Sequence, residues 1–417
     1  MGKTFGNLLA LVRKDRRLTQ EELGGDVVGA RDVSLLEKGR REPSGGALRF
    51  LAERLCAVPG YPPPAAGTDS RVFLEFTAAQ AWDERDYRAA RRHCLFAADA
   101  ALADGDPRGW WELTFMAAGC LRRLHDYPSC LAEAEMLAQH ALAAEGQPLR
   151  PQAEILLAAA CQGSGRLPDA VRHARRALEL GLSLRLDAEH LIEAYLLLIA
   201  ALSESGLLEE AWGHCQTLVI PMLEAATDPQ TAGKGFWAVG NVAFRRGDVA
   251  TGLRHHAKAE SLLTPDADLE VWAAFNRASA AMRLAEGLHD AATSDCMTHA
   301  ETALSVVGAT EEEVLENLHS RGRWQQLLGQ HEAAVQILAD VYGHREVLSP
   351  QGAAEVALHL GLSRAALGGT REAVQLLNDS AAAFYAAGAL DRASHASRLA
   401  DRARSGAPVG LNERTGA

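Results

Sequence analysis

The pattern of apolar and polar residues between positions 71 and 404 predicts a series of helical hairpins. Turns such as "GRLPDA", "GLLEEA" and "GQHEAA" carry a small residue five positions after the glycine, and such residues recur every 39 to 42 positions. These anchors are Ala90, Cys130, Ala170, Ala211, Gly252, Ala292, Ala334 and Ala373. Seven of the eight positions that lie twelve residues before an anchor are also alanine or glycine; the eight are Ala78, Ala118, Ala158, Ile199, Gly240, Ala280, Gly322 and Gly361.

A small residue on each helix of a hairpin lets the two helices approach closely where they cross. This arrangement resembles the tetratricopeptide repeat (TPR), whose usual period is about 34 residues. HEAT-like hairpins share the longer period found here, but the paired small residues favour TPR. The resemblance implies an all-α fold in which eight hairpins and a C-terminal capping helix, over residues 71–404, stack into a right-handed superhelix with a concave groove. Residues 405–417 are expected to be a disordered tail.

The first 57 residues predict a separate bundle of short helices joined to the repeats by a linker. In "LTQEEL", Thr19 and Glu22 have the spacing of a capping box at the start of a helix. A further helix is expected over roughly residues 30–38, with Val33 and Leu36 facing inward. Segment 58–70, "VPGYPPPAAGTDS", is proline-rich and is expected to be semi-rigid.

The stretch "LTQEEL…VSLLEKGRREPS" resembles the phage-repressor-type (Xre) helix-turn-helix domain over about residues 4–57. Compared with that family's usual pattern, the chain is one residue shorter between Gln20 and Glu37 and carries a double glycine. The resemblance implies a partly buried ion pair between Arg13 and Glu37, and a third helix that enters the major groove of double-stranded DNA. The residues implied to contact DNA are Gln20, Ala30, Arg31, Asp32, Ser34, Leu35, Lys38, Arg40 and Arg41.

Two kinds of contact are expected within this set. Arg31 is the candidate for direct recognition of a base, because a guanidinium group can donate to O6 and N7 of guanine together. Lys38, Arg40 and Arg41 are expected to contact backbone phosphates, which strengthens binding without regard to sequence.

The distribution of charge agrees with a polyanion partner for the N-terminal segment alone. Residues 1–55 hold eleven Lys/Arg and eight Asp/Glu, a sum of +3, whereas the whole chain carries −12, which leaves −15 for the remainder. No apolar window is long enough to span a membrane, and no secretory leader precedes the bundle. The seven cysteines are scattered without disulfide or zinc spacing. A cytoplasmic protein without membrane contact is therefore expected.

By resemblance, the first helix of each TPR hairpin lines the concave groove. The groove candidates, counted back from the anchors, are Arg122, Arg123, Lys234, Trp237, Asn241, Arg245, Arg277, Glu316, His319, Arg323 and Gln326. Amide and guanidinium groups near an aromatic ring suit the carbonyls and carboxylates of an extended peptide. The alternative is a solvated inner face without a ligand.

The combination of the two regions resembles the peptide-pheromone receptor regulators of Gram-positive bacteria (the RRNPP type), and the composition suits an actinobacterial member. The resemblance implies a quorum-sensing homodimer that binds double-stranded DNA and takes up a signalling peptide or small molecule in its TPR groove. The alternative is a DNA-tethered adaptor whose repeats bind a protein partner. Catalytic, nucleotide-binding and metal-binding motifs are absent from the sequence, so neither an enzyme nor a cofactor or metal is expected.

Overall fold

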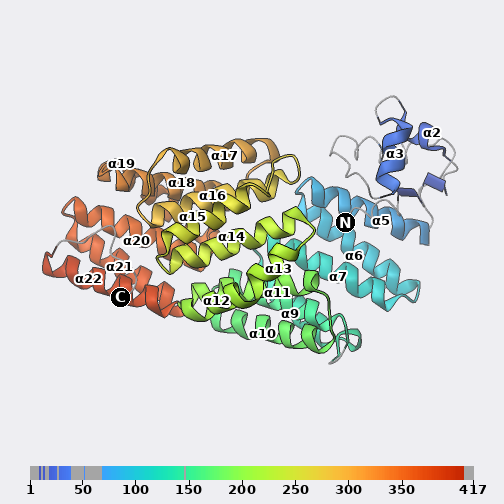
Figure 1. The fold of residues 1–417 in the computed structure, drawn as a ribbon, viewed down its shortest axis with the longest axis horizontal. Helices are drawn as coiled ribbons and strands as arrows, with labels where there is room; N and C mark the ends of the chain where they lie inside the picture. The colour runs from blue at the N-terminus through green and yellow to red at the C-terminus, as the bar shows by residue number, and fades with distance from the viewer. Residues whose placement is uncertain are drawn as a thin grey trace. The chain divides into compact units, whose positions relative to one another are not determined.

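The computed structural model describes residues 9–10, 13–14, 18–25, 28–38, 51, 68–144 and 147–407, with the backbone alone for 68–70 and 189–190. Every regular element in these ranges is a helix and none is a β-strand, which confirms the all-α prediction (Figure 1). None of these helices is long and apolar enough to cross a membrane. The chain divides into two compact units, residues 1–156 and 157–417, with the boundary inside helix α9.

The first unit contains two short helices of the N-terminal bundle and the first repeat helices. Their bounds are α2 (Gln20–Gly24), α3 (Ala30–Glu37), α5 (Thr68–Asp83), α6 (Tyr87–Ala103), α7 (Pro107–Arg123), α8 (Tyr127–Gln139), a 3₁₀ turn η1 (Ala141–Ala143) and α9 (Arg150–Gly163). Helix α5 begins at Thr68 rather than at residue 71, inside the expected linker. Its residue Phe76 belongs to the apolar cluster of the N-terminal bundle, with Leu9, Leu23, Val28, Val33, Leu36 and Leu51.

The second unit continues the series of paired helices and ends in a single helix, α22. Their bounds are α10 (Leu167–Ser183), α11 (Ala188–Glu204), α12 (Leu208–His214), a π-helical turn η2 (Cys215–Val219), α13 (Ile220–Ala225), α14 (Pro229–Arg245), α15 (Val249–Glu260), α16 (Leu269–Ala285), α17 (Ala291–Val307), α18 (Glu311–Leu327), α19 (His331–Gly343), a 3₁₀ turn η3 (Arg345–Val347), α20 (Pro350–Ala366), α21 (Thr370–Ala386) and α22 (Leu390–Ser405).

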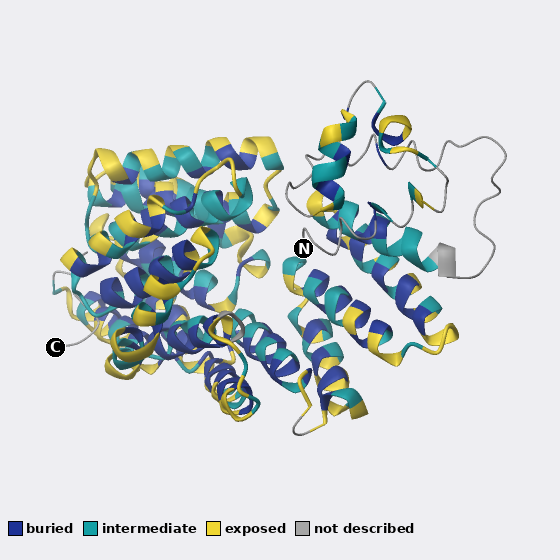
Figure 2. Cartoon of the chain, turned by 45° about the vertical axis from the view of Figure 1, so that its right-hand side comes forward, coloured by how far each residue is buried: buried dark blue, intermediate teal, exposed yellow. Residues whose placement is uncertain are grey.

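Small residues twelve positions apart meet where the two helices of a hairpin cross. The Cys130 thiol donates to the Ala118 carbonyl oxygen at 3.4 Å, directly across the α7–α8 crossing. A Cβ added at Gly240 would lie 3.3 Å from the carbonyl oxygen of Gly252. The seven small residues at these positions of the first helices are buried, as is Ile199 at the eighth, and buried residues follow the faces where helices meet (Figure 2). The close approach that the small residues permit therefore sets the spacing within each hairpin.

One anchor was assigned to the wrong residue. Ala292 is exposed, whereas the next residue, Thr293, is fully buried. The turn before α17 runs from Gly287 to Asp290, which caps the helix, whereas in α15 the capping residue follows the turn glycine directly. The longer turn delays the start of α17 and rotates its register. The Thr293 hydroxyl satisfies its hydrogen-bonding capacity by donating to the Leu288 carbonyl oxygen at 3.2 Å.

The small residue at Gly240 leads to a prediction about stability. An added Cβ would overlap the buried imidazole ring of His256, which hydrogen bonds to Asn241 at 3.0 Å and Ser279 at 3.1 Å hold in place. We expect Gly240→Ala to lower the free energy of unfolding by about 2 kcal/mol in urea denaturation, because an overpacked core must shift. The control is Gly213→Ala in α12, where the added Cβ meets open space. It should raise stability by about 0.5–1 kcal/mol. Equal effects at the two glycines would contradict the crossing-point explanation.

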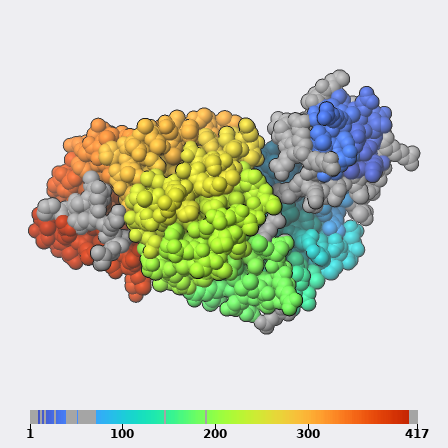
Figure 3. Space-filling model, in the orientation of Figure 1, coloured from blue at the N-terminus to red at the C-terminus, as the bar shows by residue number. Residues whose placement is uncertain are grey.

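The last helices of the second unit pack against its first helices (Figure 1). The Gln351 amide donates to the Gln162 carbonyl oxygen and the Arg392 guanidinium donates to the Glu204 carbonyl oxygen, both at 3.3 Å, across 189 and 188 residues of sequence. One apolar cluster joins the same helices and consists of Leu167, Ala354, Phe384, Ala389 and Ala393. Figure 3 shows the hairpins of this unit packed directly against one another in chain order. The superhelix of the second unit therefore curves so that its last helices, α20 to α22, contact the region from α9 to α11, where the unit begins.

Candidate functional site

Helices α2 and α3 belong to the described part of the N-terminal bundle, and a capping box starts the first of them. The Thr19 amide donates to the Glu22 carboxylate at 2.7 Å, and the Glu22 amide donates to the Thr19 hydroxyl at 3.0 Å. The double glycine that follows has two separate reasons. A Cβ at Gly24 would lie 3.0 Å from a methyl group of Val33 in α3, and Gly25 has a φ of 50°. The glycines therefore allow a tight connection between the two helices.

Helix α3 has one buried and one accessible side. Val33 and Leu36 are buried in the cluster that contains Phe76, as the apolar spacing predicted. Arg31 and Lys38 are exposed, seven residues apart and hence on the same side of the helix. The other described residues expected at DNA are partly exposed: Ala30, Asp32, Ser34 and Leu35. Arg40 and Arg41 lie outside the described residues.

A network around Glu37 joins α3 to the residues before and within α2. Arg13 Nε donates to the Glu37 carboxylate at 2.5 Å, and Arg13 Nη1 donates to the Leu18 carbonyl oxygen at 2.7 Å. The Gln20 side-chain amide donates to Glu37 at 2.7 Å. Desolvation by itself would raise the pKa of Glu37, but the hydrogen bonds from Arg13 and Gln20 bring this pKa below its ordinary value. The side chain of Gln20, which is among the residues expected to contact DNA, is thus held by Glu37.

A second candidate site is a cavity of about 320 Å³ inside the second unit. The C-terminal halves of α14, α16 and α18 line it together with α20 and α22. Three of the residues predicted for the groove are in its wall, namely Arg245, His319 and Arg323. The return of the superhelix to its beginning adds charged and polar groups from the last helices: Glu355, His359, Asp391, Arg392 and His395.

Two stacked histidines orient Arg323 in this cavity. Arg323 donates one Nη1 bond to Nε2 of His359 and one Nη2 bond to the Leu284 carbonyl oxygen at 2.8 Å. His359 Nδ1 and His319 Nε2 are 2.7 Å apart, so the network assigns the Nδ1 proton of His359 to that bond. Desolvation lowers the pKa of His319 to about 4 and that of His359 well below its ordinary value. Both rings are therefore neutral at pH 7.

An ion pair between Arg392 and Glu355 also lines the cavity. Arg392 donates to Glu355 at 3.0 Å, and its guanidinium lies 4.6 Å from the centroid of the Phe384 ring. Desolvation alone would raise the pKa of Glu355, but the positive charges of Arg392 and Arg245 bring this pKa below its ordinary value. Glu355 is thus ionised and already neutralised by Arg392.

Two other arginines of the wall have no such partner. The Arg245 guanidinium takes part in no hydrogen bond or ion pair with the described residues. Arg323 has no carboxylate within ion-pair distance among them, and its buried Nε has no hydrogen-bond acceptor. Burial lowers the pKa of Arg323 to about 10, a value at which the group remains charged at pH 7. The cavity therefore holds two guanidinium groups that interact with the charge of Glu355 through space but make no ion pair with a described carboxylate.

The remaining groove candidates lie outside this cavity. Asn241 accepts from His256, and Gln326 donates to the His359 carbonyl oxygen and to Ser363, each at 2.8 Å. Arg277 pairs with Glu316 at 2.6 Å, so those two charges neutralise each other. Lys234 is exposed nearer the start of α14, and Trp237 packs edge-on against Phe275. Arg122 and Arg123 belong to the first unit, where Arg123 lies over the rings of Trp82 and Tyr87.

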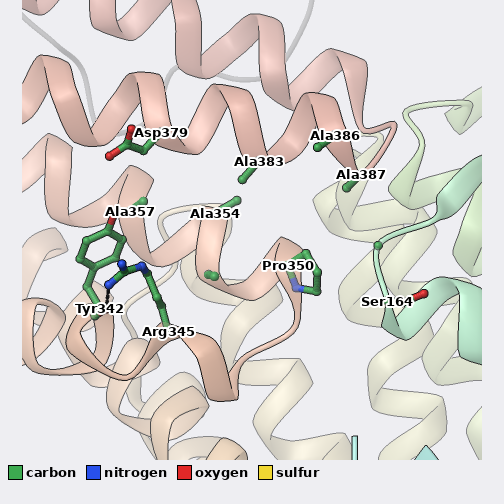
Figure 4. A pocket seen from close by; sticks show the side chains of 12 residues that line it. Ser164, Tyr342, Arg345, Pro350, Ala354, Ala357, Asp379, Ala383, Ala386 and Ala387 are labelled. Atoms are coloured by element: carbon green, nitrogen blue, oxygen red, sulfur yellow. Dashed lines mark hydrogen bonds between the residues drawn. The ribbon is translucent and has the colours of Figure 1, made fainter. Parts of the chain in front are cut away.

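A larger pocket of about 650 Å³ lies between α20, α21 and the turn that follows α9 (Figure 4). Its wall is mainly alanine, with Tyr342 and Arg345 towards one end and Ser164 at the other. Arg345 donates to the Tyr342 carbonyl oxygen at 3.1 Å, and the Ser164 hydroxyl donates to the Ala160 carbonyl oxygen at 2.9 Å. These polar groups already have partners within the protein, so the pocket offers fewer groups to a polar ligand than the charged cavity.

Comparison with known proteins identifies the fold but no family. No protein-family model and no curated protein matches the chain. A Rap protein solved in complex with Competence and Sporulation Factor has a TM-score of 0.54 at 14% identity, over 82% of this chain and 99% of its own. PlcR of Bacillus thuringiensis, solved with the peptide PapR7 and DNA, has a TM-score of 0.37 at 17% identity, over 62% of this chain and 94% of its own. The likeness to the Rap protein shows a shared TPR-like helical-repeat fold.

Proposed function

We propose that the protein is a sequence-specific DNA-binding transcriptional regulator whose TPR-like repeats dimerise and sense a peptide or small-molecule signal. The main support for DNA binding is that α3 has one side buried in the core and an opposite side that is exposed and basic. Val33 and Leu36 fix one side in the core, the network around Glu37 fixes its end, and Arg31 and Lys38 remain exposed on the other side. A short rigid helix with this exposed basic side fits the major groove of DNA.

The sensing half is supported by the cavity in the second unit. Its volume lies in the range of small-ligand sites, and its wall converges several polar groups on one space. The Rap protein with the same repeat fold was solved in complex with a signalling factor, Competence and Sporulation Factor. Because a shared fold alone does not transfer a ligand, the charged wall and not the likeness is the main support.

Dimerisation follows from the way helix-turn-helix proteins bind DNA. Two copies of such a bundle contact half-sites about one helical turn apart, and a two-fold dimer presents the two recognition helices at that separation. We therefore propose that the repeats hold two chains together and that an occupied cavity changes the geometry of the pair, which requires the ligand to bind one arrangement more tightly.

Replacement of Arg31 tests the DNA contact. We expect Arg31→Ala to weaken binding to the best duplex selected from a random library by about 10- to 100-fold, because a bidentate guanine contact contributes about 1–3 kcal/mol. Binding to unrelated duplexes should change much less. Fluorescence anisotropy at two salt concentrations measures both effects.

The matched variant on the same helix is Lys38→Ala. A phosphate contact should weaken all sequences alike and reduce the dependence of affinity on salt by about one counterion. Equal retention of every duplex by wild-type protein and both variants would reject the proposal. The DNA-tethered adaptor would be favoured instead if the wild-type protein binds DNA, co-purifies with a macromolecular partner and has no ligand in its cavity.

A further inference from the structure

The cavity of the second unit brings charged residues of both signs together: Arg245, Arg246, Arg323 and Arg392 with Glu286, Glu355 and Asp391. Arg246 pairs with Glu209 and Arg392 pairs with Glu355, whereas Arg245 and Arg323 make no ion pair with a described residue. Burial of a cation without a counter-charge is costly, and proteins retain such groups where a ligand supplies the opposite charge. The hydrogen bonds from Arg323 to His359 and to the Leu284 carbonyl oxygen orient this guanidinium but do not neutralise it.

The space next to these arginines is kept open by small residues. Helix α16 lies between α14, which carries Arg245, and α18, which carries Arg323, in chain order. Its contribution to the wall includes Ala281 and Ala285, both exposed. Because alanine has a short side chain, these two positions fill less of the cavity than longer residues would. The wall therefore combines accessible positive charge with unfilled volume.

We propose that this cavity binds an anionic group, a carboxylate or a phosphate, which pairs with Arg245 and Arg323. The inference refines the proposed sensing role by giving the ligand its chemical class. Guanidinium groups form short charge-assisted hydrogen bonds with both kinds of anion.

Arg245 is the residue that tests the proposal without disturbing the fold. Because its guanidinium takes part in no hydrogen bond or ion pair with the described residues, Arg245→Gln removes a charge but no such internal contact. The matched control is Arg321→Gln, since Arg321 lies on α18 but is exposed and pairs with Glu301. Full-length wild-type protein and both variants are compared by thermal unfolding and by isothermal titration calorimetry.

Four probes at equal ionic strength distinguish the two kinds of anion. They are sodium phosphate, sodium succinate, N-acetyl-tetraalanine with a free C-terminal carboxylate, and the same peptide as its C-terminal amide. We expect at least one anionic probe to raise the unfolding temperature by a few °C above chloride, roughly the effect of a ligand well above its Kd. Arg245→Gln should weaken that binding by about 10- to 100-fold, and Arg321→Gln should leave it unchanged.

Each outcome decides one point. Stabilisation by phosphate alone assigns a phosphorylated ligand, and tighter binding of the free-acid peptide than of its amide assigns a carboxylate. Binding of the amide and the acid with equal affinity, absence of any effect of the anions, or equal loss in the Arg321 control would overturn the anion site. Retention of a selected duplex is measured on the same samples, so failure of the anion site is separable from failure of the DNA-binding proposal.

Discussion

Replacing Phe384 by alanine is expected to lower the free energy of unfolding of the second unit by about 3–5 kcal/mol, the usual cost of emptying a buried phenylalanine site. The Phe384 side chain is 1% exposed and packs in the cluster that joins α10 to the last helices. It also lies beneath the Arg392 guanidinium in the cavity wall. The loss should therefore weaken both the contact between the two ends of the unit and the charged wall.

Hydrogen exchange locates this effect and distinguishes it from a local one. If the superhelix returns to its beginning, Phe384→Ala should increase exchange in α10 and at the end of α11, although these helices lie far away in the sequence. The adjacent variant Tyr385→Ala is the control, because that side chain is 70% exposed and should change stability by less than about 0.5 kcal/mol. Faster exchange confined to α20–α22 would contradict the contact between the ends.

Replacing Glu37 by alanine is expected to destabilise the N-terminal bundle by about 3–5 kcal/mol and, with it, to abolish the proposed DNA binding. The Glu37 side chain is 8% exposed and accepts from both Arg13 and Gln20. Its removal leaves the Arg13 guanidinium partly buried without its counter-charge, which costs more than the pair itself contributes. Urea unfolding followed by exchange at Leu23 and Val33 amides measures the change.

The double variant Arg13→Met/Glu37→Leu serves as the test of this cause. It replaces both charges by apolar groups of similar size and should recover most of the stability that Glu37→Ala loses. A double variant as unstable as Glu37→Ala would show that the carboxylate acts by some other contact.

The same network makes the bundle sensitive to acid. The pKa of Glu37 is lower in the folded protein than in the unfolded chain, so its contribution to stability is complete above the unfolded value of about 4.3 and declines as the pH falls through the lowered folded value. Glu37→Gln should remove this acid-dependent step. Titration of the bundle's stability between pH 6 and pH 2, in wild type and variant, gives the comparison.

The hairpins could be predicted from the sequence because the determining signal is local. A small residue on each helix at a fixed separation is necessary for a close crossing, and Cys130 with Ala118 shows that contact directly. The misassigned anchor at Ala292 has an equally local reason. Two additional turn residues before α17 rotate the helix, and counting from Gly287 did not take account of Asp290, the capping residue that marks where the helix begins.

The cavity was only partly predictable because its wall depends on contacts between distant parts of the chain. Arg245, His319 and Arg323 were found by counting back from the anchors, since each lies on the inner side of a first helix. Asn241 and Gln326 do not line the cavity although they lie close to these residues along their helices, because each makes hydrogen bonds within the protein. Glu355, His359 and Arg392 were missed. The curvature that brings α20 and α22 back to this wall is the sum of many small rotations, and no single motif encodes it.

Phe76 has a consequence for how motion could reach the DNA-binding helix. Phe76 belongs to α5, the first repeat helix, but its side chain packs in the same apolar cluster as Val33 and Leu36 of α3. If α5 rotates about its long axis, either the bundle must rotate with it or the Phe76 ring must leave the apolar cluster. Phe76 thus couples rotation of α5 to the bundle. A bundle separated from the repeats at residue 67 would lack this residue and the coupling with it.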